Sequence, residues 1–173
     1  MQRCAECAGR RIAFATARAA ILYDERARQF VTTWKERGQR GLAREAAALV
    51  VDALARPDVA AIAFVPSDSE RTLARGYRPA EALAGQLGRL WELPVESLVR
   101  RSRRVERRQR GLGLKERRQN VAGAFAPVRT SPARVCLIDD VYTSGATAAA
   151  AASALRKGGA RRVEVVTLAR AVR

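Results

Sequence analysis

Short apolar runs alternate with amphipathic stretches along most of this chain, and this alternation is the feature that most constrains its fold. The apolar runs have the length of buried strands, and the stretches between them have the periodicity of helices. Strands that alternate with helices form a mostly parallel central sheet flanked by helices, which predicts the α/β class. The expected strands cover residues 17–23, 59–66, 95–99, 134–138 and 163–169, and the expected helices cover residues 24–38, 42–55, 79–91 and an alanine-rich stretch that ends at Gly158 and Gly159.

The length and the cysteine content limit the number of domains and indicate the cellular compartment. With 173 residues, 48% of them hydrophobic, the chain can bury one sizeable core, and we find no internal repeat or linker. No apolar run approaches the roughly 20 residues of a membrane span, and the N-terminal residues lack the apolar core of a signal peptide. Three cysteines are an odd, sparse set that argues against a disulfide framework. We therefore expect a cytoplasmic protein without a membrane span.

The chain is strongly basic, with a net charge of +16 and no histidine. Its basic residues are 30 arginines and only three lysines, Lys35, Lys115 and Lys157. Such an excess suits anionic partners, either nucleic acid or phosphorylated small molecules. Genomic base composition can produce the same excess, so the charge alone does not choose a partner.

Two adjacent carboxylates, Asp139 and Asp140, directly follow the expected strand 134–138. In open parallel sheets, ligands bind beyond the carboxyl ends of the strands. Carboxylates there can accept hydrogen bonds from the vicinal hydroxyls of a ribose. The next residues offer hydroxyl groups, a glycine that lets a ligand approach the backbone, and the N–H groups that open a helix and can hold a phosphate. Together they predict a ribose 5-phosphate site, whose phosphate-binding residues are Thr143, Ser144, Gly145, Ala146 and Thr147.

Two other nucleotide-binding loops are excluded for this segment. It has no Gly-Lys-Ser/Thr of a P-loop and no Gly-x-Gly-x-x-Gly of a dinucleotide fold. A simpler alternative is that Asp140 or Thr143 caps an ordinary helix after an ordinary strand-to-helix turn. The combination of both acids with the whole loop favours the phosphate site.

The segment VCLIDDVYTSGAT is similar to the phosphoribosyl-diphosphate signature of type I phosphoribosyltransferases. Other segments resemble one branch, the ComF family of competence-related proteins. The resemblance implies a type I phosphoribosyltransferase-like (Rossmann-like) domain over residues 17–173, preceded by a remnant of a cysteine-containing segment over residues 1–16. The segments that carry it are ARAAILYDERARQFVTTWKERG, VP followed by RTLARGY, NVAGAF and GGARRVEVVTLAR.

The same resemblance implies roles for individual residues. Asp139 and Asp140 would hold the ribose hydroxyls and serve catalysis, and residues 143–147 would hold the 5-phosphate. A second loop would bind the diphosphate and its Mg²⁺, with Ser67 and Arg71 among its residues. No protein nucleophile is implied, since catalysis would rest on positioning and charge stabilisation.

A basic segment over residues 100–119 holds ten basic side chains against two acidic ones. The resemblance implies a mobile loop here that closes over the diphosphate, with Arg103 or Arg104 as a charge clamp. Two alternatives stay open. The segment can be a groove for single-stranded DNA, although it lacks aromatic residues for base stacking, or a solvated basic loop.

Cys4 and Cys7 have the spacing of half a zinc knuckle. Members of the resembled family often carry a four-cysteine zinc ribbon ahead of the domain. Two cysteines cannot close a tetrahedral Zn²⁺ site, so we expect an incomplete half-site here. Cys136 lies in an expected strand and is expected in the core.

The resemblance implies a protein that binds phosphoribosyl diphosphate or a nucleotide with Mg²⁺. It also implies a role in DNA uptake during natural transformation, with single-stranded DNA and a competence helicase as partners. Whether the protein is an enzyme stays open; if it is one, it is a glycosyltransferase of the phosphoribosyltransferase type. The alternative is a non-catalytic single-stranded nucleic-acid-binding or adaptor protein on the same fold, which Asp68, Glu70 and the basic segment favour.

Overall fold

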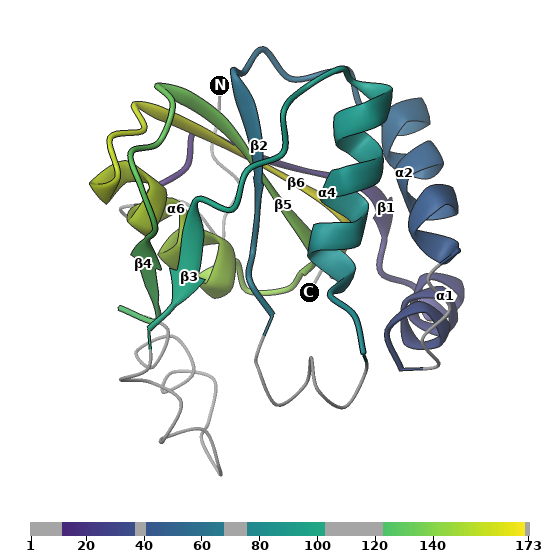
Figure 1. Ribbon diagram of the computed structural model, residues 1–173. Helices are drawn as coiled ribbons and strands as arrows, with labels where there is room; N and C mark the ends of the chain where they lie inside the picture. The colour runs from purple at the N-terminus through teal and green to yellow at the C-terminus, as the bar shows by residue number, and fades with distance from the viewer. Residues whose placement is uncertain (1–11, 37–40, 68–75, 103–122, 172–173) are drawn as a thin grey trace, which may run out of the picture.

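A four-stranded, wholly parallel sheet forms the centre of the protein, in the order β1-β6-β5-β2 (Figure 1). The computed structural model describes residues 12–36, 41–67, 76–102 and 123–171. The α/β class and the parallel sheet predicted from the sequence are confirmed. The strands are β1 (Thr16–Leu22), β2 (Ala61–Phe64), β5 (Arg134–Tyr142) and β6 (Arg162–Arg170).

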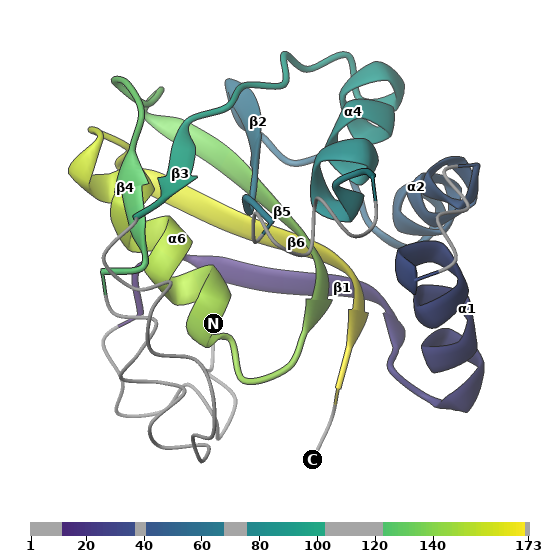
Figure 2. The ribbon, with the colours of Figure 1, turned by 60° about the horizontal axis from the view of Figure 1, so that its bottom comes forward.

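Helices cover both faces of this sheet (Figures 1 and 2). One face packs against α1 (Glu25–Glu36), α2 (Leu42–Ala53) and α4 (Pro79–Leu90). The other packs against α6 (Ala146–Lys157) and the hairpin of β3 (Val99–Arg101) and β4 (Phe125–Pro127). None of the helices in the described ranges is long and apolar enough to span a membrane.

The central strand β5 is buried on both sides, which explains why its sequence is a continuous apolar run rather than an alternating one. Cys136 and Ile138 belong to the core on the α2 and α4 side, and Val135 and Leu137 belong to the core on the α6 side. All four side chains are fully buried.

The ends of two helices follow their sequence signals. Pro79 opens α4 in the first turn, where its missing N–H costs nothing. Gly158 ends α6, and Gly159 follows with a φ of 109°, a conformation that glycine adopts without strain. The predicted end of the alanine-rich helix is therefore confirmed.

The strand expected at residues 95–99 does not join the central sheet, so this prediction was wrong. Val95 makes only an isolated bridge to Ile62. The N–H of Leu98 then donates to the carbonyl of Glu96 at 3.0 Å, and this tight turn takes the chain off the sheet edge. Beyond the turn, β3 pairs with β4 in an antiparallel hairpin over α6.

Two leucines of α4 test how far the fold depends on this packing. Leu87 is 0% exposed and Leu90 is 54% exposed on the same helix. We expect Leu87→Ala to lower the free energy of unfolding by about 2–5 kcal/mol, because it leaves a cavity between α4 and the sheet. Leu90→Ala is the matched control, with an expected change within about 0.5 kcal/mol. Urea unfolding measures both, and equal losses would contradict the assignment of α4's buried face.

Candidate functional site

The acid pair lies within β5 and not after it. The sequence predicted a strand ending at Ile138, but β5 continues to Tyr142 because its backbone pairing with β6 continues. Asp139 lies opposite Thr167 of β6. On the other side, β2 ends at Phe64, opposite Ile138. The two carboxylates therefore lie just beyond the end of one neighbouring strand while the other neighbour still supports them.

Each carboxylate accepts a backbone hydrogen bond from the next residue. The N–H of Asp140 donates to Asp139 Oδ1 at 2.9 Å, and the N–H of Val141 donates to Asp140 Oδ1 at 2.7 Å. The second oxygen of Asp140 pairs with Lys35 Nζ of α1 at 2.6 Å. The pair is thus fixed from its own strand and from a helix far away in the sequence.

Burial raises the pKa of the Asp139 carboxyl from its ordinary value of 3.8 to about 7, and the neighbouring Asp140 charge adds to this effect. Three groups oppose the rise in pKa: the backbone N–H of Asp140, Lys35 and Arg101. Among the described residues, Lys35 and Arg101 are thus the cations outside β5 that lower the pKa of Asp139.

Gly145 determines the shape of the loop between β5 and α6. Its φ of 70° is in the left-handed region, and a Cβ atom there would lie 2.2 Å from the Tyr142 hydroxyl oxygen. Only glycine therefore fits without a shift of the Tyr142 ring. The loop can pass this close to the strand because residue 145 has no side chain.

The N-terminus of α6 has Gly145 as its N-cap residue and no side-chain cap. The N–H of Ala146 donates a long bond to Ser144 Oγ at 3.4 Å. Neither Asp140 nor Thr143 caps the helix, so the capping role that the simpler alternative gave them is wrong. The first N–H groups of α6 and the positive end of its dipole lie directly after the loop, which is the arrangement that favours an anion.

Ser67 lies at the same end of the sheet. Ser67 follows Val65 and Pro66 in the chain. The N–H of Val65 donates to the carbonyl of Ile138 at 2.9 Å. Arg101 Nε donates to the Pro66 carbonyl at 3.1 Å, and the Arg101 guanidinium lies 5.2 Å from the centre of the Phe125 ring. Because β2 and β5 are parallel neighbours, the loops that follow them meet at one edge. The structure thus places Ser67, the acid pair and residues 143–147 at the same end of the sheet.

The remaining predicted site residues lie outside the described residues: Arg71, Arg103, Arg104, Cys4 and Cys7. Their roles stay predictions, as does the division into residues 1–16 and 17–173. Within the described ranges, no group of three or more histidine, cysteine or acidic side chains could hold a metal ion. Cys136 is buried in the core as expected, and burial raises the pKa of its thiol to about 12.

Lys35 and Arg101 are the two residues that sequence reasoning missed. One signal was present for Lys35, since it is one of three lysines in a chain that otherwise uses arginine. Arg101 was counted only as part of the basic segment. Because the sequence predicted a strand over residues 95–99, Arg101 was expected after that strand. It lies instead in β3, and its Nε contacts the Pro66 carbonyl after β2.

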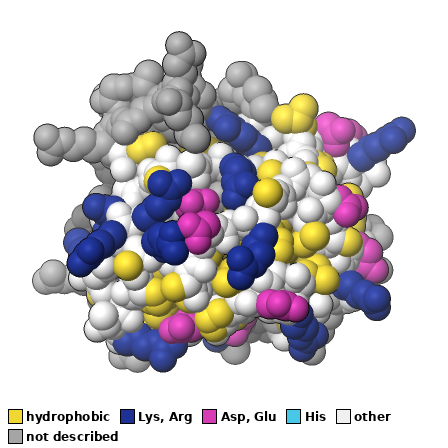
Figure 3. All heavy atoms as spheres, turned by 90° about the horizontal axis from the view of Figure 1, so that it is seen from above, with side chains coloured by type: hydrophobic (Ala, Val, Ile, Leu, Met, Phe, Trp, Pro, Cys, Tyr) yellow, Lys and Arg dark blue, Asp and Glu magenta, His cyan; other side chains and the backbone are white. Residues whose placement is uncertain are grey.

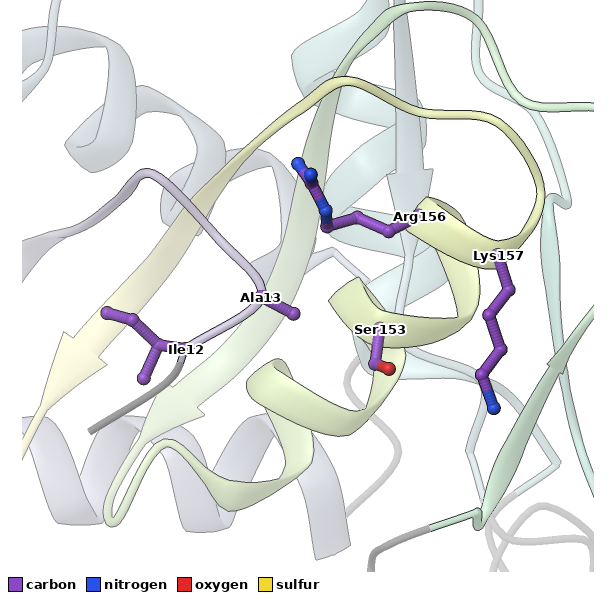
Figure 4. Close-up of a pocket in the computed structure, with 5 residues that line it drawn as sticks. All are labelled: Ile12, Ala13, Ser153, Arg156 and Lys157. Carbon is purple, nitrogen blue, oxygen red and sulfur yellow. The ribbon is translucent and has the colours of Figure 1, made fainter.

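A cavity of about 390 Å³ lies elsewhere, between the segment before β1 and the C-terminal half of α6 (Figure 4). It is lined by Ile12, Ala13, Ser153, Arg156 and Lys157. Arg156 and Lys157 extend away from each other in Figure 4, and Arg156 donates to the carbonyl of Arg161 at 2.7 Å. Cations in the last turn of a helix balance its dipole, so the charges here have a structural cause.

The sheet is parallel and covered on both faces, and an acid pair and a small-residue loop lie where β5 leads into α6. These features define an α/β protein with a candidate ligand site at the carboxyl ends of its strands. The chain is similar to competence protein F of Haemophilus influenzae. The two sequences are 39% identical over an alignment of 120 residues that covers 64% of this chain and 50% of that protein. This similarity confirms the resemblance seen in the sequence, and the chain spans about half the length of this curated relative.

No protein-family model matches the chain. Two solved structures show a weaker likeness. Glutamine phosphoribosylpyrophosphate amidotransferase from B. subtilis has a TM-score of 0.48 at 21% identity, over 75% of this chain and 26% of that chain. The protein TT1426 from Thermus thermophilus has a TM-score of 0.44 at 20% identity, over 73% of this chain and 82% of that chain. TM-scores below 0.5 do not establish a common fold, so the fold assignment rests on the chain's own sheet and loop.

Two glycines test the geometry of the loop. We expect Gly145→Ala to lower the free energy of unfolding by about 1–3 kcal/mol, because the new methyl group meets the Tyr142 ring at a positive φ. Gly85→Ala in α4 is the matched control, since a Cβ there meets no atom within 4 Å. It should stabilise the protein by about 0.5–1 kcal/mol through helix propensity. Thermal unfolding measures both variants, and a shift of the melting temperature in the same direction for both would contradict this geometry.

The raised pKa of Asp139 predicts a pH-dependent effect of Asp139→Asn. The folded state binds the proton of the Asp139 carboxyl more tightly than the unfolded state does. The stability that this bound proton contributes is therefore fully present below about pH 4 and is lost as the pH rises through about 7. Asparagine does not titrate. Relative to the parent, we expect Asp139→Asn to gain about 2–4 kcal/mol between about pH 4 and pH 8.

Urea unfolding of both proteins at the two pH values measures this gain. The exposed Asp52→Asn is the control for the chemical change itself. A difference between Asp139→Asn and the parent that is the same at both pH values would show that the Asp139 carboxyl does not carry the shifted pKa.

Proposed function

We propose that this site binds the ribose 5-phosphate part of phosphoribosyl diphosphate or of a nucleotide. The observation that carries the proposal is the short connection between two carboxylates and a helix N-terminus without a side-chain cap. The carboxylates are acceptors for ribose hydroxyls, and the first N–H groups of α6 are donors for a phosphate. Gly145 lets the loop join them without a side chain in between.

Magnesium fits these residues if the ligand brings most of its oxygens. Both Oδ1 atoms of the acid pair accept backbone N–H groups, and Asp140 Oδ2 pairs with Lys35. Mg²⁺ is commonly held by one or two carboxylates together with substrate phosphates. Asp139 would therefore be its main protein ligand, and the ion would neutralise charge on a diphosphate.

For phosphoribosyl transfer, the described residues would position the ligand and stabilise charge. The acid pair would orient the ribose, and the N-terminus of α6 would hold the 5-phosphate. Arg101, whose Nε donates to the Pro66 carbonyl just after β2, would face the leaving diphosphate. We propose this glycosyltransferase chemistry, and the name of the relative, competence protein F, supports a role in competence. We propose DNA uptake as that role.

A second candidate is binding of single-stranded DNA without catalysis. Figure 3 shows arginine and lysine side chains gathered on the face opposite to the loops that follow β2 and β5. Three of the arginines near the start of β5 and β6 are engaged with carboxylates: Arg129 with Glu96, Arg134 with Asp58, and Arg162 with Glu164. The net charge of +16 nevertheless favours polyanions, and such binding would weaken steeply with salt.

Calorimetric titration of phosphoribosyl diphosphate with Mg²⁺ tests the proposal. We expect the double variant Asp139→Asn, Asp140→Asn to lose at least about tenfold in affinity, because it removes both charged acceptors. The double variant Asp52→Asn, Asp58→Asn is the matched control, since it makes the same change of charge at exposed positions.

Two results would count against the proposal. The first is a parent protein that does not bind the ligand. The second is an acid-pair variant that keeps the parent's affinity for single-stranded DNA, while neither protein binds phosphoribosyl diphosphate. This result would favour the adaptor function.

A further inference from the structure

We infer that Lys35 of α1 determines what the acid pair accepts: it neutralises Asp140 and so makes the pair a receptor for ligand hydroxyls instead of a site for a free divalent cation. This inference rests on the proposed function for the identity of the ligand. The part that concerns cations can be tested without that ligand.

The Lys35–Asp140 ion pair is close and partly shielded from water. Nζ lies 2.6 Å from Oδ2, and the two side chains are 22% and 17% exposed. Solvent and salt weaken such a pair less than they weaken a pair on the open surface. The ammonium group is therefore a resident counter-ion of the acid pair and occupies an oxygen that a metal ion would otherwise take.

The backbone beside Lys35 is held in place. Trp34 is 0% exposed in the core, and its carbonyl accepts a hydrogen bond from the Tyr77 hydroxyl. Tyr77 comes just before α4, so α1 and the start of α4 are linked at this point. A side chain that extends from a fixed backbone loses less freedom when it makes its ion pair, which favours a persistent contact.

The charge balance gives Lys35 its effect on specificity. Two adjacent carboxylates are hard oxygen ligands of the type that Mg²⁺ and Mn²⁺ prefer. With Lys35 in place, one of these charges is compensated, whereas hydroxyl groups can still donate to the remaining lone pairs. A phosphorylated ligand is an anion, so the same compensation also reduces its repulsion by the acid pair.

Binding of Mn²⁺ to the ligand-free protein tests this. We expect Lys35→Met to bind Mn²⁺ at least about tenfold more tightly than the parent, because it exposes the uncompensated pair. Lys35→Arg keeps the charge and should behave as the parent. Lys157→Met is the matched control, since it removes a lysine from the far end of α6. Asp140→Asn in the Lys35→Met background should abolish the gain.

The second measurement is the affinity for phosphoribosyl diphosphate with Mg²⁺, which should fall about tenfold in Lys35→Met and be retained in Lys35→Arg. Circular dichroism establishes that the variants fold, and Lys35→Gln replaces Lys35→Met if the latter does not. Equal Mn²⁺ affinities in parent and variant would overturn the inference and leave Lys35 as a structural ion pair. A gain in Mn²⁺ affinity without any binding of phosphoribosyl diphosphate would support the inference on cations and overturn the proposed function.

Discussion

Compensation of the charges on Asp139 and Asp140 is the constraint on which the rest of the site depends. Two neighbouring carboxylates in a partly buried strand lose hydration and repel each other, and both effects raise the pKa of Asp139. The opposing groups come from three directions: the backbone of β5, Lys35 of α1 and Arg101 of β3. Elements on both faces of the sheet therefore provide positive charge that compensates this one pair of side chains.

The phosphate end of the site depends on small residues instead of charges. Gly145 allows the loop to pass the Tyr142 ring, and α6 continues with alanines whose side chains are buried against the sheet. Small side chains let a helix pack close to the strands, which keeps its N-terminus near the end of β5. An N-cap residue with a polar side chain would satisfy the first N–H groups internally; glycine leaves them to other acceptors.

The sheet could be predicted from the sequence because burial on both faces makes its strands continuous apolar runs, as Val135 to Ile138 illustrate. The end of β5 could not, because Asp139 and Asp140 interrupt the apolar run while the backbone pairing with β6 continues. The acid pair and its loop were visible as a local motif. Lys35 and Arg101 were not, since their contacts join segments far apart in the chain, and no local pattern encodes such a contact.

The raised pKa of Asp139 also connects the site to the stability of the fold. At neutral pH the folded protein holds a carboxyl group whose ionisation it disfavours, so the acid pair by itself reduces stability. Hydrogen bonds donated to the charged form lower such a pKa again, and a vicinal diol can supply them. Part of the free energy lost by placing two acids in β5 would then be recovered when a ribose binds. A polar pair that is costly in the folded protein and relieved by a ligand is typical of a site kept for binding and not for folding.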